Sequence, residues 1–370
     1  MNKYAFFIGM FISFLLSACS NENGNTGITH FAYQEIENGK WGIISIEGEV
    51  VVPPMFHDMP TPVTDGMFFV PTQDNKYELH NIETPGKVIG SEYVKISSFS
   101  EGRAFVVQNE SNISCIDKNG DVLYKLPNEI TMALPFCYGR ALIGKIDENI
   151  ASPVYGFIDK EGEIIIPCDF LMATSFSGKY AVAAKKNEGN ISILDRNGIM
   201  VDNINGDTEN ETLDIIANTL SIWGKIETDI VPYVANRNFG LKKIKGNIIL
   251  AASPKYKMIS SSNRGYCVYQ TENGYGIMKE NGEEIVADKY SYISSCNENG
   301  SECFAASINN RWGIFSMDEK TLCEPIYDLI IGIVNSNNFI AVRNGDYFLI
   351  EKDGKILKHF NNINTTPASL

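Results

Sequence analysis

Basic residues and histidines are the scarce classes in this 370-residue sequence: 31 Lys and Arg stand against 45 Asp and Glu, with four His. The acidic residues are spread evenly, and no basic cluster is present of the kind that displaces counterions from a nucleic acid. The sequence therefore predicts no nucleic-acid partner. The formal net charge of −14 mainly favours solubility.

Motifs for catalysis and metal binding are also lacking. The histidines fall at unrelated positions, and no GxSxG, HExxH or phosphate-binding loop is present. No CxxC motif or Cys/His pair has metal-ligand spacing, and no two carboxylates stand out as an acid and a base. We therefore expect no metal or other cofactor and favour a protein that is not an enzyme.

Long hydrophobic runs are lacking except near the N-terminus, where residues 5–16 are twelve apolar or small residues that follow the single charge of Lys3. Twelve helical residues span about 18 Å, less than the ~30 Å hydrocarbon core, so residues 1–18 are typical of a signal peptide. The segment Leu16-Ser17-Ala18-Cys19 resembles the bacterial lipobox, in which a peptidase cuts before a Cys that then receives lipid.

The lipobox resemblance implies that Cys19 is the first mature residue and is acylated, so that the mature chain carries a net charge of −15 once Lys3 is removed. Residues 19–27 then form a polar tether with little drive to fold. Ser20, in place of Asp, favours the outer over the inner membrane of a bacterial cell envelope. The alternative is an ordinary secretory signal that happens to contain a cysteine.

An internal repeat covers most of the remaining chain. Its clearest copies are Lys40-Trp41-Gly42-Ile43-Ile44 and Tyr155-Gly156-Phe157-Ile158, each followed by a turn and an aliphatic run. The second position of successive copies falls at residues 42, 78, 114, 156, 192, 240, 276, 313 and 348, mostly 35–37 residues apart. This regularity predicts a tandem-repeat architecture.

Each copy is expected to form four short strands, because runs of about five β-branched and aromatic residues alternate with Gly, Asn, Asp and Pro. The aromatic first position is expected to pack between copies, and the adjacent Gly to let a neighbouring ring lie over bare backbone. A second Gly follows six residues later in seven copies, where a hairpin needs a positive φ: Gly48, Gly120, Gly162, Gly198, Gly246, Gly282 and Gly354.

This pattern resembles the WG (KWG) repeat family, with Lys40-Trp41-Gly42 and Arg311-Trp312-Gly313 as literal matches. The resemblance extends over roughly residues 30–360. It implies a binding or structural module of an exported bacterial protein, and it supplies no catalytic residues.

The expected fold is all-β. Consecutive apolar residues such as Ile43-Ile44, residues 50–52 and residues 164–166 suggest strands buried on both faces, as in small sheets stacked face to face. A β-propeller of eight or nine blades is preferred over an open stack, because Ile28–Tyr33 resembles a lone fourth strand and the last copy ends early. The predicted repeat domain is 28–360, with a tail at 361–370.

The cysteines are expected to be mostly buried small hydrophobic residues. Cys296 and Cys303 are the exception, since they flank a short polar segment and are predicted to face each other across a hairpin. In an oxidising compartment this geometry favours a disulfide.

The longest interruption of the repeat, residues 202–227, is the candidate recognition loop. It is acidic and hydrophilic, with an out-of-register tryptophan, and its candidate residues are Asp202, Asp207, Glu209, Glu211 and Trp223. The expected function is a membrane-anchored scaffold that presents loops to a protein or glycan partner. The alternative is a propeller-type hydrolase or lyase with its site at a central channel.

Overall fold

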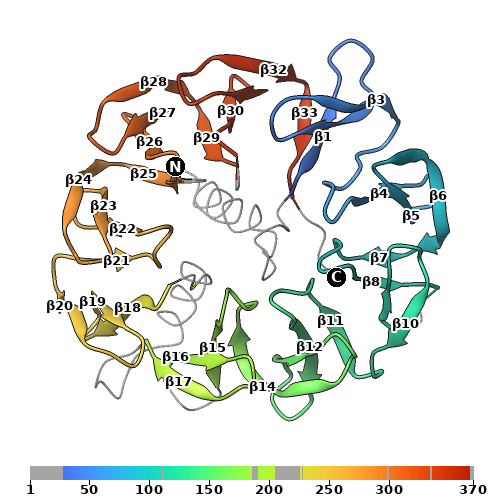
Figure 1. Ribbon diagram of the computed structural model, residues 1–370, viewed down its shortest axis with the longest axis horizontal. Helices are drawn as coiled ribbons and strands as arrows, with labels where there is room; N and C mark the ends of the chain where they lie inside the picture. The colour runs from blue at the N-terminus through green and yellow to red at the C-terminus, as the bar shows by residue number, and fades with distance from the viewer. Residues whose placement is uncertain are drawn as a thin grey trace. The chain divides into compact units, whose positions relative to one another are not determined.

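The computed structural model describes residues 28–109, 112–185, 191–204, 226, 228–297, 300–333 and 336–366, and every regular element in these ranges is a β-strand (Figure 1). The strands form small antiparallel sheets whose members follow one another along the chain. The predicted all-β class of tandem, propeller-like sheets is therefore confirmed. No helix of the described residues is long and apolar enough to cross a membrane.

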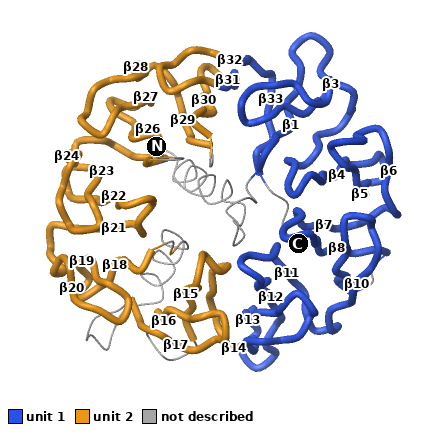
Figure 2. Tube along the Cα trace, viewed as in Figure 1, with its two compact units in different colours: residues 1–168, 346–349, 357–370 blue, residues 169–345, 350–356 orange. Residues whose placement is uncertain are grey.

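The chain divides into two compact units (Figure 2), of which unit 1 comprises residues 1–168, 346–349 and 357–370. Its sheets are β33-β1-β2-β3, β4-β5-β6, β7–β10 and the first strands of the sheet β11–β17. Their bounds are β1 His30–Gln34, β2 Trp41–Ser45, β3 Val50–Phe56, β4 Met67–Pro71, β5 Tyr77–Asn81, β6 Thr84–Tyr93, β7 Lys95–Ile96, β8 Ala104–Val107, β9 Ser114–Ile116, β10 Val122–Lys125, β11 Ile130–Ala133, β12 Ala141–Asp147, β13 Ser152–Ile158, β14 Ile164–Ala173 and β33 Asn362–Asn364.

Unit 2 comprises residues 169–345 and 350–356. It holds the remaining strands of the sheet β11–β17, the sheets β18–β20, β21–β24 and β25–β28, and the strands β29 and β30 of the sheet β29–β32, whose strands β31 and β32 belong mostly to unit 1. Their bounds are β15 Tyr180–Lys185, β16 Ile191–Asp195, β17 Met200–Asn203, β18 Ile230–Ala235, β19 Asn238–Lys243, β20 Ile248–Ser253, β21 Met258–Ile259, β22 Tyr266–Gln270, β23 Tyr275–Lys279, β24 Glu284–Tyr290, β25 Tyr292–Cys296, β26 Cys303–Ile308, β27 Arg311–Ser316, β28 Thr321–Tyr327, β29 Leu329–Gly332, β30 Phe339–Arg343, β31 Asp346–Ile350 and β32 Ile356–Phe360.

The sheets are two strands out of phase with the sequence repeats. The Tyr155 copy begins with β13 and β14, which are the third and fourth strands of β11-β12-β13-β14. The long strand β14 ends one four-stranded group and begins the next, so the seven-stranded sheet β11–β17 contains two such groups. Counted in this way, the described residues contain nine groups of three or four strands. This number lies within the predicted eight or nine.

The same phase shift brings the two ends of the repeat region together. Strand β1 pairs with β2 and, on its other side, with β33, where Tyr33 opposes Ile363. The lone fourth strand predicted near residue 28 is thus completed by a strand from the other end of the chain. The sequence predicts a tail at 361–370, but residues 362–364 form strand β33, which pairs with the otherwise open edge of β1.

The repeat glycine after the aromatic residue is required by close approach of the neighbouring strands. A Cβ atom on Gly156 would lie 2.4 Å from the carbonyl oxygen of Ile166, and one on Gly276 would lie 2.5 Å from the ring of Tyr269. The predicted stacking of a ring over bare backbone is confirmed at Gly276.

The core lies between successive sheets. Met67, Phe69 and Leu79 of the sheet β4–β6 form one buried cluster with Ala104 and other residues of the sheet β7–β10. In unit 2, a second cluster joins Leu241 of β19 to Cys267, Tyr269 and Met278 of the next sheet. Each sheet therefore buries its apolar faces against its neighbours.

The strands that follow the hairpin glycine depart from the prediction of two buried faces in β3 and β14. Val50 and Val51 of β3 are 45% and 41% exposed, whereas Val52 is fully buried. Ile164 in β14 is likewise 45% exposed and Ile166 is buried. A strand such as β3 lies at the edge of its sheet. Alternate side chains on it consequently lack a covering neighbour.

These edge strands carry features that hinder further strand pairing. Their pairing with the preceding strand shifts register in β2–β3, β5–β6, β19–β20, β23–β24 and β27–β28. Prolines lie within several of them, at Pro53, Pro85 and Pro325. Bulges and prolines at an edge limit unwanted association with other chains.

Candidate functional site

The recognition loop proposed from the sequence is described only at its ends. Asp207, Glu209, Glu211 and Trp223 lie outside the described residues, as does Cys19. At one end β17 reaches Asn203, so the scaffold extends into the segment predicted to be irregular.

Buried aliphatic residues fix both ends of this insertion. Ile204 is 1% exposed and Ile226 is 3% exposed, and both belong to one hydrophobic cluster of unit 2. The carbonyl of Ile204 also accepts a hydrogen bond of 2.8 Å from the N–H of Val234. The residues on either side of 205–225, which lie outside the described ranges, are therefore both held in the core of unit 2.

Asp202 forms hydrogen bonds at the base of this insertion. Its carboxylate accepts a hydrogen bond of 2.6 Å from Lys242 Nζ and one of 2.9 Å from the N–H of Lys245. Burial works against ionisation of Asp202, but these hydrogen bonds outweigh it and lower the pKa of the carboxyl. Asp202 thus anchors the insertion, which differs from its predicted role in recognition.

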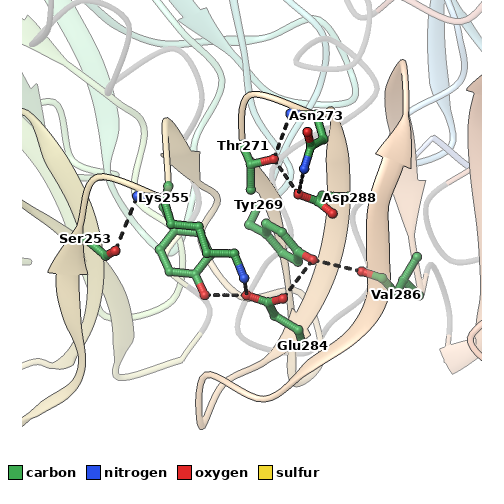
Figure 3. Close-up of polar contacts among 9 residues, drawn as sticks. Ser253, Lys255, Tyr269, Thr271, Asn273, Glu284, Val286 and Asp288 are labelled. Atoms are coloured by element: carbon green, nitrogen blue, oxygen red, sulfur yellow. Dashed lines mark hydrogen bonds and ion pairs between the residues drawn. The ribbon is translucent and has the colours of Figure 1, made fainter.

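A polar cluster in unit 2 is centred on Glu284, the first residue of β24 (Figure 3). Its carboxylate accepts hydrogen bonds of 2.5 Å from Lys255 Nζ and from the hydroxyl of Tyr256, and one of 3.3 Å from the hydroxyl of Tyr269. Lys255 and Tyr256 belong to the connection between β20 and β21. The cluster therefore ties that connection to the sheet β21–β24.

The protonation states in this cluster are fixed near neutral pH. Burial disfavours the charged form of Glu284, yet the hydrogen bonds from Lys255 and Tyr256 prevail and lower its pKa. Burial, together with the adjacent carboxylate, raises the pKa of the Tyr256 and Tyr269 hydroxyls. The tyrosines remain donors and Glu284 remains an acceptor, which suits a structural tie better than proton transfer.

A second carboxylate of the same strand closes a turn. Asp288 accepts hydrogen bonds from the hydroxyl of Thr271, at 2.5 Å, and from the side-chain amide of Asn273, at 3.1 Å (Figure 3). Asp328, between β28 and β29, instead links two sheets, because it pairs with Arg311 of β27 and accepts a hydrogen bond of 2.7 Å from the N–H of Asn344, which follows β30.

Carboxylates in unit 1 link neighbouring sheets at their turns. The N–H of Gly102 donates to Asp65 over 2.6 Å, and the N–H of Gly139 donates to Glu101 over 3.0 Å. Glu101, whose side chain is only 4% exposed, also pairs with Lys160 at 2.7 Å. Sequence reasoning missed these ties. The available signal was a residue-Gly pair that recurs at nearly the repeat spacing, at Asp65-Gly66, Glu101-Gly102 and Tyr138-Gly139.

The structure does not bring Cys296 and Cys303 together. Cys296 lies opposite Phe304 in the β25–β26 pairing, so Cys303, the neighbour of Phe304, points to the other face of the sheet. Both residues carry thiols and both are buried. The expected disulfide across this hairpin is therefore absent from the structure, because the strand register separates the side chains.

No group of three or more His, Cys, Asp or Glu side chains is arranged to hold a metal ion within the described ranges. The polar clusters that are described connect turns, strands and sheets. Together with the tandem sheets, they define a β-repeat protein.

Comparison with known families finds a match in three segments of the chain. Residues 41–77, 86–110 and 155–188 match the family described as WG containing repeat, in agreement with the sequence resemblance. No curated protein matches the chain.

Solved structures show likeness at the level of the fold. A eukaryotic initiation factor is similar with a TM-score of 0.55 and 9% identity, over 92% of this chain and 98% of that chain. AztD of Citrobacter koseri is matched with a TM-score of 0.43 and 8% identity, over 92% of this chain and 95% of that chain.

Proposed function

We propose that this protein is a lipid-anchored, non-catalytic binding protein of the bacterial cell envelope. Its WG repeats form a scaffold, and the insertion between residues 204 and 226 is presented to a protein or glycan partner. The observation that carries the proposal is the fixed base of this insertion, at which Ile204 and Ile226 are buried and Asp202 is paired with Lys242.

The packing of the residues that flank the insertion supports this role. Residues 204 and 226 each pack into the core cluster of their own unit, and the strands on either side, β17 and β18, have their own pairing partners. Long insertions on regular scaffolds often carry the binding function, because they vary without loss of the core. The acidic residues 207, 209 and 211 would set a preference for a partner surface of positive charge.

The experiment replaces residues 205–225 with a short Gly-Ser linker and keeps Asp202, Ile204 and Ile226. We expect the variant to fold with a melting temperature close to that of the wild type, because the replaced segment starts and ends outside the buried base. We also expect it to lose the partner that the wild type captures from envelope extracts. The matched control, Trp223→Ala with the loop intact, separates loss of one aromatic contact from loss of the whole loop.

Unfolding of the linker variant would show that the insertion belongs to the scaffold. Normal folding with unchanged capture of the partner would place the binding surface elsewhere.

The proposed anchor has its own test. Cys19→Ala in the native host is expected to release the protein from the membrane fraction, and mass spectrometry of the wild type is expected to find acyl chains on Cys19. A wild-type protein that is soluble and unacylated would contradict the anchor.

A further inference from the structure

The chain enters unit 1 at one defined end of its first sheet. His30, the first residue of β1, lies opposite Ser45, the last residue of β2. Thr29 is held there as well, because its carbonyl accepts a hydrogen bond of 3.1 Å from the N–H of Ile46. The hairpin between β2 and β3 is therefore at the end where the chain enters, and the turn between β1 and β2, residues 35–40, is at the opposite end.

The turns at this end form a connected surface in unit 1, which we call the entry end. It comprises residues 46–49, 65–66, 101–102, 138–139 and 160–162. The turn at 65–66 binds the turn at 101–102 through Asp65 and Gly102, and Glu101 in turn binds Gly139 and Lys160. The start of β1 joins the segment before β4 through the N–H of Val63, which donates to the carbonyl of His30 over 3.0 Å.

The short tether between Cys19 and Ile28 allows the entry end of the first sheet to reach a membrane more easily than the opposite end, at residues 35–40. Cys19 and Ile28 are separated by nine peptide steps, so the tether reaches at most about 30 Å when fully extended. A random-coil chain of this length has a typical end-to-end distance of only about 16 Å. The five residues of β2 alone span about 17 Å. To bring the far end of the sheet against a membrane, the tether would have to run back along the whole length of the strands in a nearly extended state.

We propose that the anchored protein holds the entry end of unit 1 toward the lipid surface and the turn at residues 35–40 away from it. This inference rests on the proposed lipid at Cys19. It assigns the entry end to the membrane and leaves the opposite end of the first sheets accessible to a partner from the aqueous side.

The test uses two exposed glutamates of the first sheet, Glu47 at the entry end and Glu37 in the opposite turn. Each is changed separately, Glu47→Cys or Glu37→Cys, in the acylated full-length protein, and labelled with a fluorophore on vesicles whose headgroups carry a collisional quencher. We expect quenching to be severalfold stronger at position 47 than at position 37. The unsubstituted protein gives the background from its own cysteines, most of which are buried.

A second pair of labelled positions controls for a substitution that disturbs the fold at the first pair. Glu83, in the turn whose neighbour Ile82 donates its N–H to Gly66, is compared with Asp74 in the opposite turn of the same sheet. Stronger quenching for Glu83→Cys than for Asp74→Cys is expected. Insertion of about twenty Gly-Ser residues after Ser20 should remove both differences, because a tether of that length reaches either end.

Equal quenching within both pairs, or stronger quenching at positions 37 and 74, would overturn the proposed orientation while leaving the anchor intact. Failure of the acylated wild type to associate with the vesicles at all would instead refute the anchor, and the orientation with it.

Discussion

At the residue scale, the hairpin glycines of the repeats act as contact points between sheets. Gly162 has a φ of 89°, and a Cβ atom there would lie 2.7 Å from the ring of Tyr124 in the preceding sheet group. Gly282 and Gly354 approach Leu250 and Cys323 in the same way. The glycine therefore meets two demands at once, a left-handed backbone and a close neighbour.

These two demands can be separated by substitution. Gly162→Val is expected to lower the free energy of unfolding by more than Gly102→Val, which serves as the matched control. Gly102 also has a positive φ, of 80°, but a Cβ atom there meets nothing within 4 Å. Backbone strain alone should cost about 1–3 kcal/mol in each variant, and the clash with Tyr124 adds to it at position 162. Urea unfolding measures both, and equal losses would show that the contact with Tyr124 is unimportant.

A buried histidine gives unit 1 a dependence on pH. His80 is 4% exposed, stacks on Phe68 at 5.4 Å, and its Nδ1 lies 2.9 Å from the carbonyl oxygen of Pro85. Burial lowers the pKa of His80, although Pro85 and Glu78 act in the opposite direction. The unfolded chain therefore binds a proton more readily than the folded one, and stability is lost as the pH falls through the unfolded value near 6.5.

The wild type is expected to lose stability between pH 7 and pH 5, with a contribution from His80 of at most about 1.4 kcal/mol per pH unit. His80→Gln removes the titrating group, so its unfolding free energy should fall less steeply over the same range. Denaturant titrations at several pH values provide the slopes, and parallel slopes would exclude His80 as the source.

The hairpin glycines were predictable from the sequence because their spacing follows the repeat. Six of the seven have a positive φ, and Gly246 is the exception, since Lys245 takes the left-handed position there with a φ of 56°. In the Trp312 copy, which lacks the glycine, Glu319 occupies the equivalent position with a φ of 62°. The backbone conformation is thus kept when the residue type changes, which a pattern based on Gly alone does not detect.

At the scale of the strand, the pairing of β1 with β33 joins segments from opposite ends of the repeat region. Strand β33 covers an edge of β1, and Asn364 donates a further hydrogen bond of 2.9 Å to the carbonyl of Pro60. The side chains of Asn361 and Gln34 are hydrogen-bonded as well, at 2.9 Å.

Truncation after Asn361 is therefore expected to destabilise the protein by about 2–3 kcal/mol, from the loss of a few backbone hydrogen bonds. Truncation after Thr366 is the control, because it leaves β33 complete. Thermal unfolding monitored by circular dichroism should show a lower melting temperature for the first variant alone. Identical melting temperatures would mean that β33 contributes nothing to the stability of the sheet.

The exposed aliphatic residues of edge strands such as β3 show where an apolar run in the sequence wrongly predicts burial on both faces. Val50-Val51-Val52 and Ile43-Ile44 look alike as apolar runs, but the first lies on an edge strand and the second is buried throughout. Burial depends on the position of a strand within its sheet, and this position follows from pairing between strands that local composition does not specify.

At the scale of the whole molecule, the sequence predicts the scaffold far better than the site. The repeat spacing gives the strands, the turns and even the pairing of the two chain ends, because each copy encodes the same local contacts. The role of Asp202 could not be predicted, since its partners Lys242 and Lys245 lie in the next sheet. The same holds for Cys296 and Cys303, whose orientation depends on the strand register.

The pairing of β1 with β33 also has a consequence for the timing of folding. The contact between Gln34 and Asn361 spans 327 residues of sequence. The first sheet therefore cannot be completed until residues 362–364 are available to pair with β1. Contacts of such long range form slowly, because the intervening chain must be ordered or closed as a loop. If the protein crosses the membrane N-terminus first, its earliest strand emerges beside the tether with one edge unpaired. That edge is then open to chaperones, or to aggregation, until the last strand arrives.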